Sequence, residues 1–142
     1  MAQEPAARAP RDDRSGIQLV FHGWSAAQRV ALGPAPWFRV AGNFIREGPA
    51  GEIVAALRNH QWVLKDQHFT RFECAQPVVL HFEDAAGGAS PPLGPYGAIS
   101  VADGALYAGE KLVAKFVEET QLWHCFPTEN FWPVVVLSPA SA

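Results

Sequence analysis

Residues 67–84, QHFTRFECAQPVVLHFED, alternate between apolar and polar side chains on either side of a short turn. Such alternation is typical of β-strands that bury one face, because successive side chains of a strand point to opposite sides. Pro77 and the two residues before it predict the turn. We therefore predict an antiparallel hairpin in which Phe72 faces Leu80. Its apolar face would carry Thr70, Phe72, Cys74, Val78, Leu80 and Phe82.

The opposite face of this predicted hairpin gathers charged side chains. The same register sets Arg71 opposite His81, with Glu73 and Glu83 as near neighbours. Slipping either strand by one residue would mix apolar and polar side chains on both faces, so burial favours this register. The sequence therefore predicts a polar surface patch.

The rest of the chain predicts further short strands, separated by turns rich in Gly and Pro. Residues 52–60 fit both helical and strand spacing, and we favour a strand because the segments around them are strand-like. Asp103-Gly104 between apolar runs predicts a two-residue hairpin turn that sets Val101 opposite Leu106. Pro133 favours an edge position for the last strand. The remaining candidate strands lie within residues 17–22, 29–32, 37–46, 62–65, 96–126 and 132–138.

These patterns predict an all-β protein. The fold would be an antiparallel β-sandwich or a small closed β-barrel of about nine to eleven short strands. Residues 1–16 contain no large apolar residue after Met1, so we expect a disordered tail there. Residues 17–142 are long enough for a single β domain with its own core.

The composition excludes some classes of partner. The chain has 142 residues and a formal net charge of −3, and its lysines and arginines form no run. Nucleic-acid binding demands clustered positive charge, so we expect no nucleic-acid partner. No stretch approaches the ~18 uninterrupted apolar residues of a membrane helix, so we expect no membrane partner.

The two cysteines, Cys74 and Cys125, bear on the compartment. The first sixteen residues lack the apolar segment of a secretory signal, so we expect a cytoplasmic protein. In a reducing compartment the two cysteines are expected to be buried free thiols rather than a disulfide.

His81-Phe82-Glu83 places an imidazole and a carboxylate two residues apart on one strand face. This pair could bind a metal ion if a neighbouring strand supplied His60 or His68 as a third ligand. Exposed charges that pair with one another explain the same pattern without a metal, and we favour that explanation. The chain contains no GxSxG, P-loop, GxGxxG or HExxH motif. We therefore assign no catalytic residue, no metal ligand and no cofactor.

Five tryptophans are a high count for this length. Most would fill the core or its rim, and an exposed one could stack on a sugar ring or another flat ligand. In the predicted register of residues 96–126, Lys115 lies across from Trp123, which would allow a cation–π contact. The candidate ligand-binding residues are Arg71, His81, Glu83, Trp62 and Trp123.

Three hypotheses for function follow from these patterns. The leading one is a non-catalytic β-domain that binds a small molecule or a protein partner through an aromatic-lined patch or pocket between the sheets. The second is a metal-dependent β-barrel enzyme that uses His81 and Glu83. The third is a structural or assembly subunit that extends a partner's sheet through residues 132–138, and it predicts a homo-oligomer or another assembly.

Overall fold

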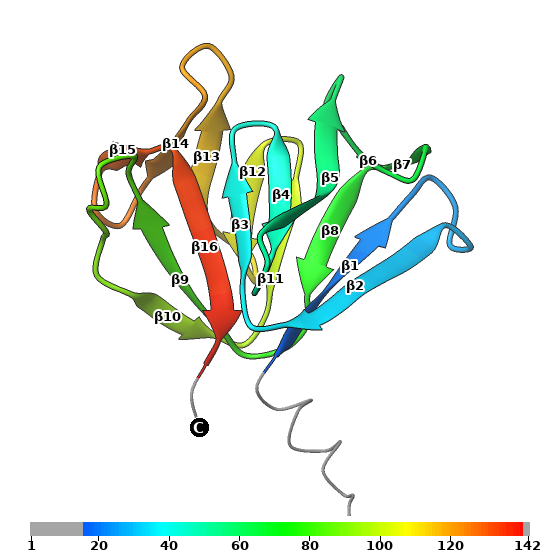
Figure 1. The fold of residues 1–142 in the computed structure, drawn as a ribbon, viewed down its shortest axis with the longest axis horizontal. Helices are drawn as coiled ribbons and strands as arrows, with labels where there is room; N and C mark the ends of the chain where they lie inside the picture. The colour runs from blue at the N-terminus through cyan, green and yellow to red at the C-terminus, as the bar shows by residue number, and fades with distance from the viewer. Residues whose placement is uncertain (1–15, 141–142) are drawn as a thin grey trace, which may run out of the picture.

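The computed structural model describes residues 16–140, which form two antiparallel β-sheets packed face to face as a sandwich (Figure 1). Each sheet has eight strands, and the described residues contain no helix. The all-β prediction and its sandwich alternative are confirmed. The described residues form 16 strands, more than predicted. Residues 37–46 and 67–74 are each divided into two strands, and Leu93–Tyr96 and Asn130–Trp132 form strands largely outside the predicted segments.

Sheet I consists of β1 (Ile17–His22), β2 (Arg29–Ala35), β8 (Arg71–Cys74), β11 (Ile99–Ala102), β12 (Ala105–Ala108), β13 (Lys111–Val117), β14 (Leu122–Cys125) and β15 (Asn130–Trp132). Its strand order is β15-β14-β13-β12-β11-β8-β1-β2. Sheet II consists of β3 (Phe38–Ala41), β4 (Phe44–Glu47), β5 (Glu52–Arg58), β6 (Gln61–Leu64), β7 (Gln67–Phe69), β9 (Val78–Glu83), β10 (Leu93–Tyr96) and β16 (Val134–Pro139). Its strand order is β10-β9-β16-β3-β4-β5-β6-β7.

Two-residue turns join several neighbouring strands. Asp103 and Gly104 have φ values of 53° and 76°, the positive angles that a type I′ turn requires, and Val101 pairs with Leu106 as predicted. Residues 52–60 form β5 and its turn, which confirms the strand interpretation. These turns bring successive strands of one sheet side by side.

Four aromatic side chains join the two sheets in the core. Phe21 and Phe72 belong to sheet I, and Trp62 and Phe69 belong to sheet II. The ring centroid of Phe21 lies 6.0 Å from that of Phe69, and the centroid of Trp62 lies 5.4 Å from that of Phe72. All four side chains are buried. We call them the aromatic cluster.

The predicted hairpin of residues 67–84 does not form. β8 pairs with β1 and β11 in sheet I, whereas β9 pairs with β10 and β16 in sheet II. The chain crosses from one sheet to the other at residues 75–77. Alternation determines which side chains are buried, and it is satisfied equally when two strands pair and when they lie on opposite walls of a core. Five of the six residues predicted on the apolar face, Phe72, Cys74, Val78, Leu80 and Phe82, are fully buried. Thr70 is only half-buried, whereas Phe69, which the same alternation places on the polar face, is fully buried.

The side chain of Gln76, in the segment that crosses between the sheets, forms hydrogen bonds with the backbone at the beginning of β1. Its Oε1 accepts a hydrogen bond from the backbone N–H of Gln18 at 2.7 Å, and its Nε2 donates to the carbonyl of Gly16 at 3.3 Å. Gly16 is buried, although we predicted it as the last residue of a disordered tail. The rest of that predicted tail, residues 1–15, lies outside the described residues.

Three further segments differ from the predictions. Residues 37–46 form two strands rather than one, because Gly42 with its φ of 58° lies in a turn between β3 and β4. β2 continues through Pro34, which is tolerated because β2 is an edge strand. β16 lies between β9 and β3, and Pro133 stands just before it. The assembly hypothesis assumed an edge strand at residues 132–138, whereas β16 is an interior strand of sheet II.

A bulge changes the register predicted for residues 96–126. The pairing of β12 with β13 shifts at Val113. The β13–β14 turn spans residues 118–121, because Val117 pairs with Leu122. Lys115 therefore lies across from His124 on the outer face, whereas Trp123 is buried on the inner face. The predicted contact between Lys115 and Trp123 is therefore wrong.

Cys74 and Cys125 are both buried free thiols, as predicted. Burial raises the pKa of the Cys74 thiol. Within residues 16–140, no helix is long and apolar enough to cross a membrane.

We predict that Phe21→Ala destabilises the protein by about 3–5 kcal/mol, because it leaves a cavity in the aromatic cluster. Chemical denaturation followed by tryptophan fluorescence measures this difference. Phe131→Ala is the control, since that side chain is 54% exposed and its loss should change the free energy of unfolding by less than about 1 kcal/mol. Equal stability of the Phe21 variant and the wild type would contradict the role given to the cluster.

Candidate functional site

Turns and loops from both sheets enclose a groove at one end of the sandwich. Two hollows of about 450 and 440 Å³ adjoin there, because His60 and Asp103 line both. We call the two hollows together the end groove. The first hollow is lined by Trp24, Asn59, His60, Gln61, Thr70, Arg71 and Asp103. The second is lined by Leu57, His60, Asp103, Lys115, Phe116 and Glu118, with their neighbours.

The β1–β2 loop presents Trp24 to solvent at the first hollow. The Gln28 side chain closes this loop, since its Oε1 accepts hydrogen bonds from the backbone N–H of Trp24 at 3.0 Å and of Ser25 at 3.3 Å. The N–H of Gly23 donates to the carbonyl of Gln28 at 2.8 Å. A Cβ at Gly23 would lie only 2.6 Å from the Gln28 side chain, so the loop needs glycine there. The loop thus fixes the backbone of Trp24 and leaves its side chain 75% exposed.

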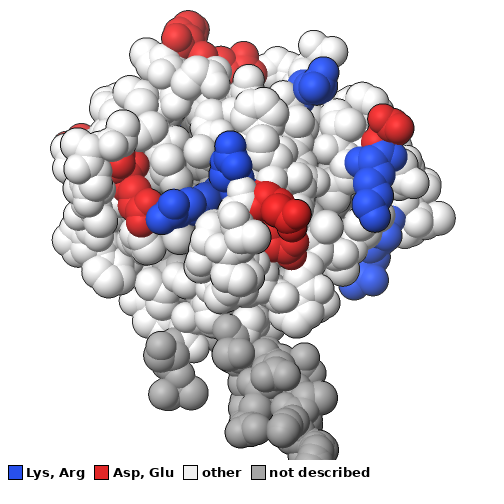
Figure 2. Space-filling model, in the orientation of Figure 1, with Lys and Arg blue, Asp and Glu red and all other residues white. Residues whose placement is uncertain are grey.

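The β5–β6 turn brings Asn59, His60 and Gln61 to the groove. His60 Nδ1 lies 3.3 Å from Glu118 Oε2, so a turn of sheet II contacts the β13–β14 turn of sheet I. Acidic side chains over the β13–β14 turn are visible at the top of Figure 2. Both partners of this ion pair are more than half exposed, so it adds little to stability.

Among the five predicted ligand-binding residues, Arg71 alone lines the end groove. Its Nη1 donates to Glu73 Oε1 at 3.3 Å, and Glu73 Oε2 lies 2.8 Å from His22 Nε2. The hydrogen bond with His22 is the main cause that lowers the pKa of Glu73; desolvation opposes it, and Arg71 lowers the pKa further. Glu73 is therefore ionised near neutral pH and holds the Arg71 guanidinium beside the groove.

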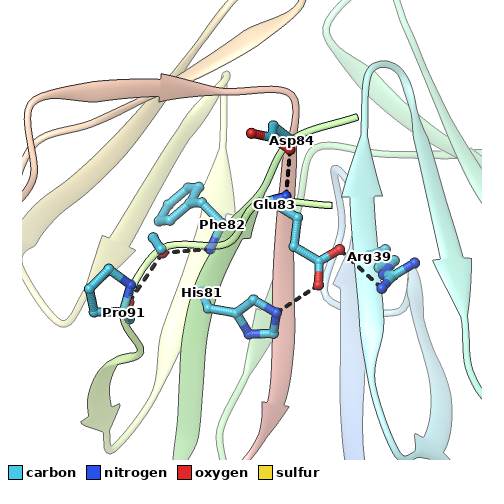
Figure 3. A network of polar contacts seen from close by, with 8 residues as sticks. Arg39, His81, Phe82, Glu83, Asp84 and Pro91 are labelled. Carbon is cyan, nitrogen blue, oxygen red and sulfur yellow. Dashed lines mark hydrogen bonds and ion pairs between the residues drawn. The ribbon is translucent and has the colours of Figure 1, made fainter. Parts of the chain in front are cut away.

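His81 and Glu83 lie elsewhere, on the outer face of sheet II (Figure 3). His81 Nε2 is 2.9 Å from Glu83 Oε2, and Arg39 Nη2 is 3.0 Å from Glu83 Oε1. The predicted placement of His81 and Glu83 on one strand face is confirmed. The predicted pairing of Arg71 with His81 is wrong, because β8 and β9 belong to different sheets. Over the face seen in Figure 2, acidic and basic side chains are interspersed in small groups.

Trp62 and Trp123, the two aromatic candidates, lie in the core and are 4% and 2% exposed. They therefore do not line an open pocket between the sheets. Trp62 contributes to the end groove indirectly, since it belongs to the aromatic cluster and adjoins Gln61, which lines the first hollow.

The structure brings no third ligand to His81 and Glu83. Among residues 16–140, no group of three or more His, Cys, Asp or Glu side chains is placed to hold a metal ion. Neither His60 nor His68 completes such a site, and Glu83 instead pairs with Arg39.

Trp24, Asn59 and Gln61 were not predicted as site residues, and His60 was considered only as a possible metal ligand. A local signal exists for Trp24, because this large aromatic residue stands in a loop and outside any alternating run. No comparable signal marks Asn59 or Gln61. They reach the groove only through the order of strands in the two sheets.

No protein-family model, curated protein or solved structure matches this chain. Its function is therefore inferred from the geometry of the end groove.

We predict that Glu73→Gln removes part of the acid sensitivity of folding. The pKa of Glu73 lies below its usual value of 4.5, so its contribution to stability is complete above about pH 4.5 and is lost as the pH falls through the lowered pKa. The difference in the free energy of unfolding between wild type and Glu73→Gln should therefore shrink between about pH 5 and pH 3.

Urea denaturation at each pH measures this difference. Glu110→Gln is the matched control, because Glu110 is exposed and forms no ion pair or side-chain hydrogen bond among the described residues. A wild-type advantage over Glu73→Gln that stays constant down to pH 3 would contradict the assigned role of Glu73.

Proposed function

We propose that this protein is a non-catalytic binding module whose end groove takes a neutral oligosaccharide. The observation that carries this proposal is a solvent-exposed tryptophan, Trp24, beside a concave surface of hydrogen-bonding side chains. Small-molecule sites combine an apolar or aromatic surface with a few polar groups that fix orientation, and they commonly occupy about 300–1,000 Å³. The first hollow lies within that range.

The chemistry of the first hollow suits a sugar ring. One side of such a ring presents C–H groups, which are attracted to the negative face of an indole such as that of Trp24. Its hydroxyl groups both donate and accept hydrogen bonds. The amides of Asn59 and Gln61 do the same, whereas the Arg71 guanidinium only donates and the Asp103 carboxylate only accepts.

The second hollow would extend the binding surface. It adjoins the first at His60 and Asp103, so a ligand of several units could continue from Trp24 toward Lys115. We also propose that the module acts in the cytoplasm, because free Cys74 and Cys125 suit a reducing compartment.

We predict that Trp24→Ala weakens binding at least about tenfold, because exposed aromatic anchors commonly dominate binding energy. Isothermal titration with maltotetraose, cellotetraose, mannotetraose and chitotetraose identifies the bound sugar and gives its affinity for each variant. The substitution should leave the free energy of unfolding within about 0.5 kcal/mol of wild type, since the loop is closed through backbone groups and Gln28.

Phe131→Ala, which removes an exposed aromatic side chain outside the groove, is the matched control and should bind as wild type does. Absence of binding to all four sugars at millimolar concentration would refute the proposal. Equal affinity of wild type and Trp24→Ala would refute the role of the groove.

A further inference from the structure

A third hollow of about 500 Å³ lies between the two sheets at the side of the sandwich where β2 and β7 are the edge strands. It is separate from the end groove, since the two share no lining residue. In Figure 1 the strands that enclose it, β2 and β5–β7, lie on the right. We call this hollow the edge slot.

The walls of the edge slot are aliphatic. Val30 and Leu32 come from β2, Ile53 and Val54 from β5, and Leu64 from β6. Val30 and Leu32 are only half-buried, and Ile53 is 50% exposed. Exposed aliphatic surface gathered in a concave site is a feature of ligand sites rather than of ordinary protein surface.

A β-bulge in β5 sets two consecutive aliphatic residues at the slot. Ala55 pairs with Ile45 and Ile53 pairs with Arg46, so Val54 is the extra residue in the pairing of β5 with β4. In a regular strand the side chains of residues 53 and 54 would point to opposite faces. A bulge redirects side chains locally, and here both residues line one hollow.

The slot carries one charge, at Lys65, and Gln67 is the only other polar side chain in its lining. Two acidic residues are close in sequence to the lining, Glu52 before Ile53 and Asp66 between Lys65 and Gln67, but neither lines the slot. A ligand that matches this lining has an aliphatic body and a single negative charge.

We propose that the edge slot binds one unbranched alkyl chain with a carboxylate head, that is, a free fatty acid. The chain lies against Val30, Leu32, Ile53, Val54 and Leu64. The carboxylate pairs with the Lys65 ammonium and accepts a hydrogen bond from the Gln67 amide. This ligand does not depend on the end groove being a sugar site.

Calorimetric titration of the full chain with hexanoate, octanoate, decanoate and dodecanoate, each below its micelle concentration, tests the proposal. Affinity should rise about three- to fourfold for each added methylene until the chain fills the slot, and should then level off. No detectable binding of dodecanoate, or an affinity that ignores chain length, would overturn it.

Two variants with matched controls locate the ligand. Ile53→Asp should abolish dodecanoate binding, whereas Phe131→Asp, a similar change at an exposed apolar residue outside the slot, should not affect it. Lys65→Gln should weaken dodecanoate about two- to fivefold and leave decanol binding unchanged, as expected for a partly exposed ion pair. Lys111→Gln is the control for this loss of charge.

Thermal unfolding without ligand shows whether each variant is folded, and Lys65→Gln alters only an exposed side chain. Equal effects of Lys65→Gln and Lys111→Gln would overturn the placement of the head group. Binding to phosphatidylglycerol vesicles without binding to free dodecanoate would instead identify a membrane contact and overturn the fatty-acid proposal.

Discussion

The contact between the aromatic side chains of the two sheets is the interaction on which the end groove depends. Phe72 of sheet I packs against Trp62 of sheet II, and Phe21 packs against Phe69. Each of these residues adjoins a residue of the groove or its support: Gln61 precedes Trp62, Thr70 follows Phe69, Arg71 precedes Phe72 and His22 follows Phe21. Because successive side chains of a strand point to opposite faces, an aromatic ring held in the core fixes the direction of the polar side chain beside it. Burial of the cluster therefore organises a polar surface that has few strong contacts of its own.

The two proposed sites differ in chemistry because they occupy different parts of a sandwich. The end of a sandwich is built from turns, whose residues must be compatible with solvent and tight backbone angles, so many of the side chains that line the end groove are polar. The side of a sandwich is where inner-face residues of an edge strand can lack a covering strand. Val30 and Leu32 of β2 are in that position, and Ile53 and Leu64 extend the apolar surface. A hollow between sheets at an edge is consequently lined mainly by aliphatic side chains, whereas a hollow between turns combines polar side chains with apolar ones.

The sequence predicted which side chains are buried much better than it predicted which strands are neighbours. Alternation placed Phe72, Cys74, Val78, Leu80 and Phe82 in the core correctly, and the Asp103-Gly104 signal predicted its hairpin correctly. The same alternation could not show that residues 75–77 cross between sheets, because a two-residue period carries no information about the partner strand. The errors in the candidate site follow from this. Arg71 and His81 were brought together only by the false hairpin, whereas Asn59, Arg71 and Asp103 are brought together by a strand order that local patterns do not encode.

The width of the end groove is also set by packing rather than by charge. Within residues 16–140, a single ion pair links its two rims, that of His60 with Glu118. Both partners are more than half exposed, and such pairs contribute little. Below it, Trp62 and Phe72 are buried and in edge-to-face contact, and they belong to opposite sheets. Separating the rims would break the contact between these rings and expose them to water. The free energy lost in this way far exceeds the free energy that an exposed ion pair contributes. The polar residues of the turns can therefore be replaced without loss of the spacing between the sheets, because the aromatic cluster maintains that spacing.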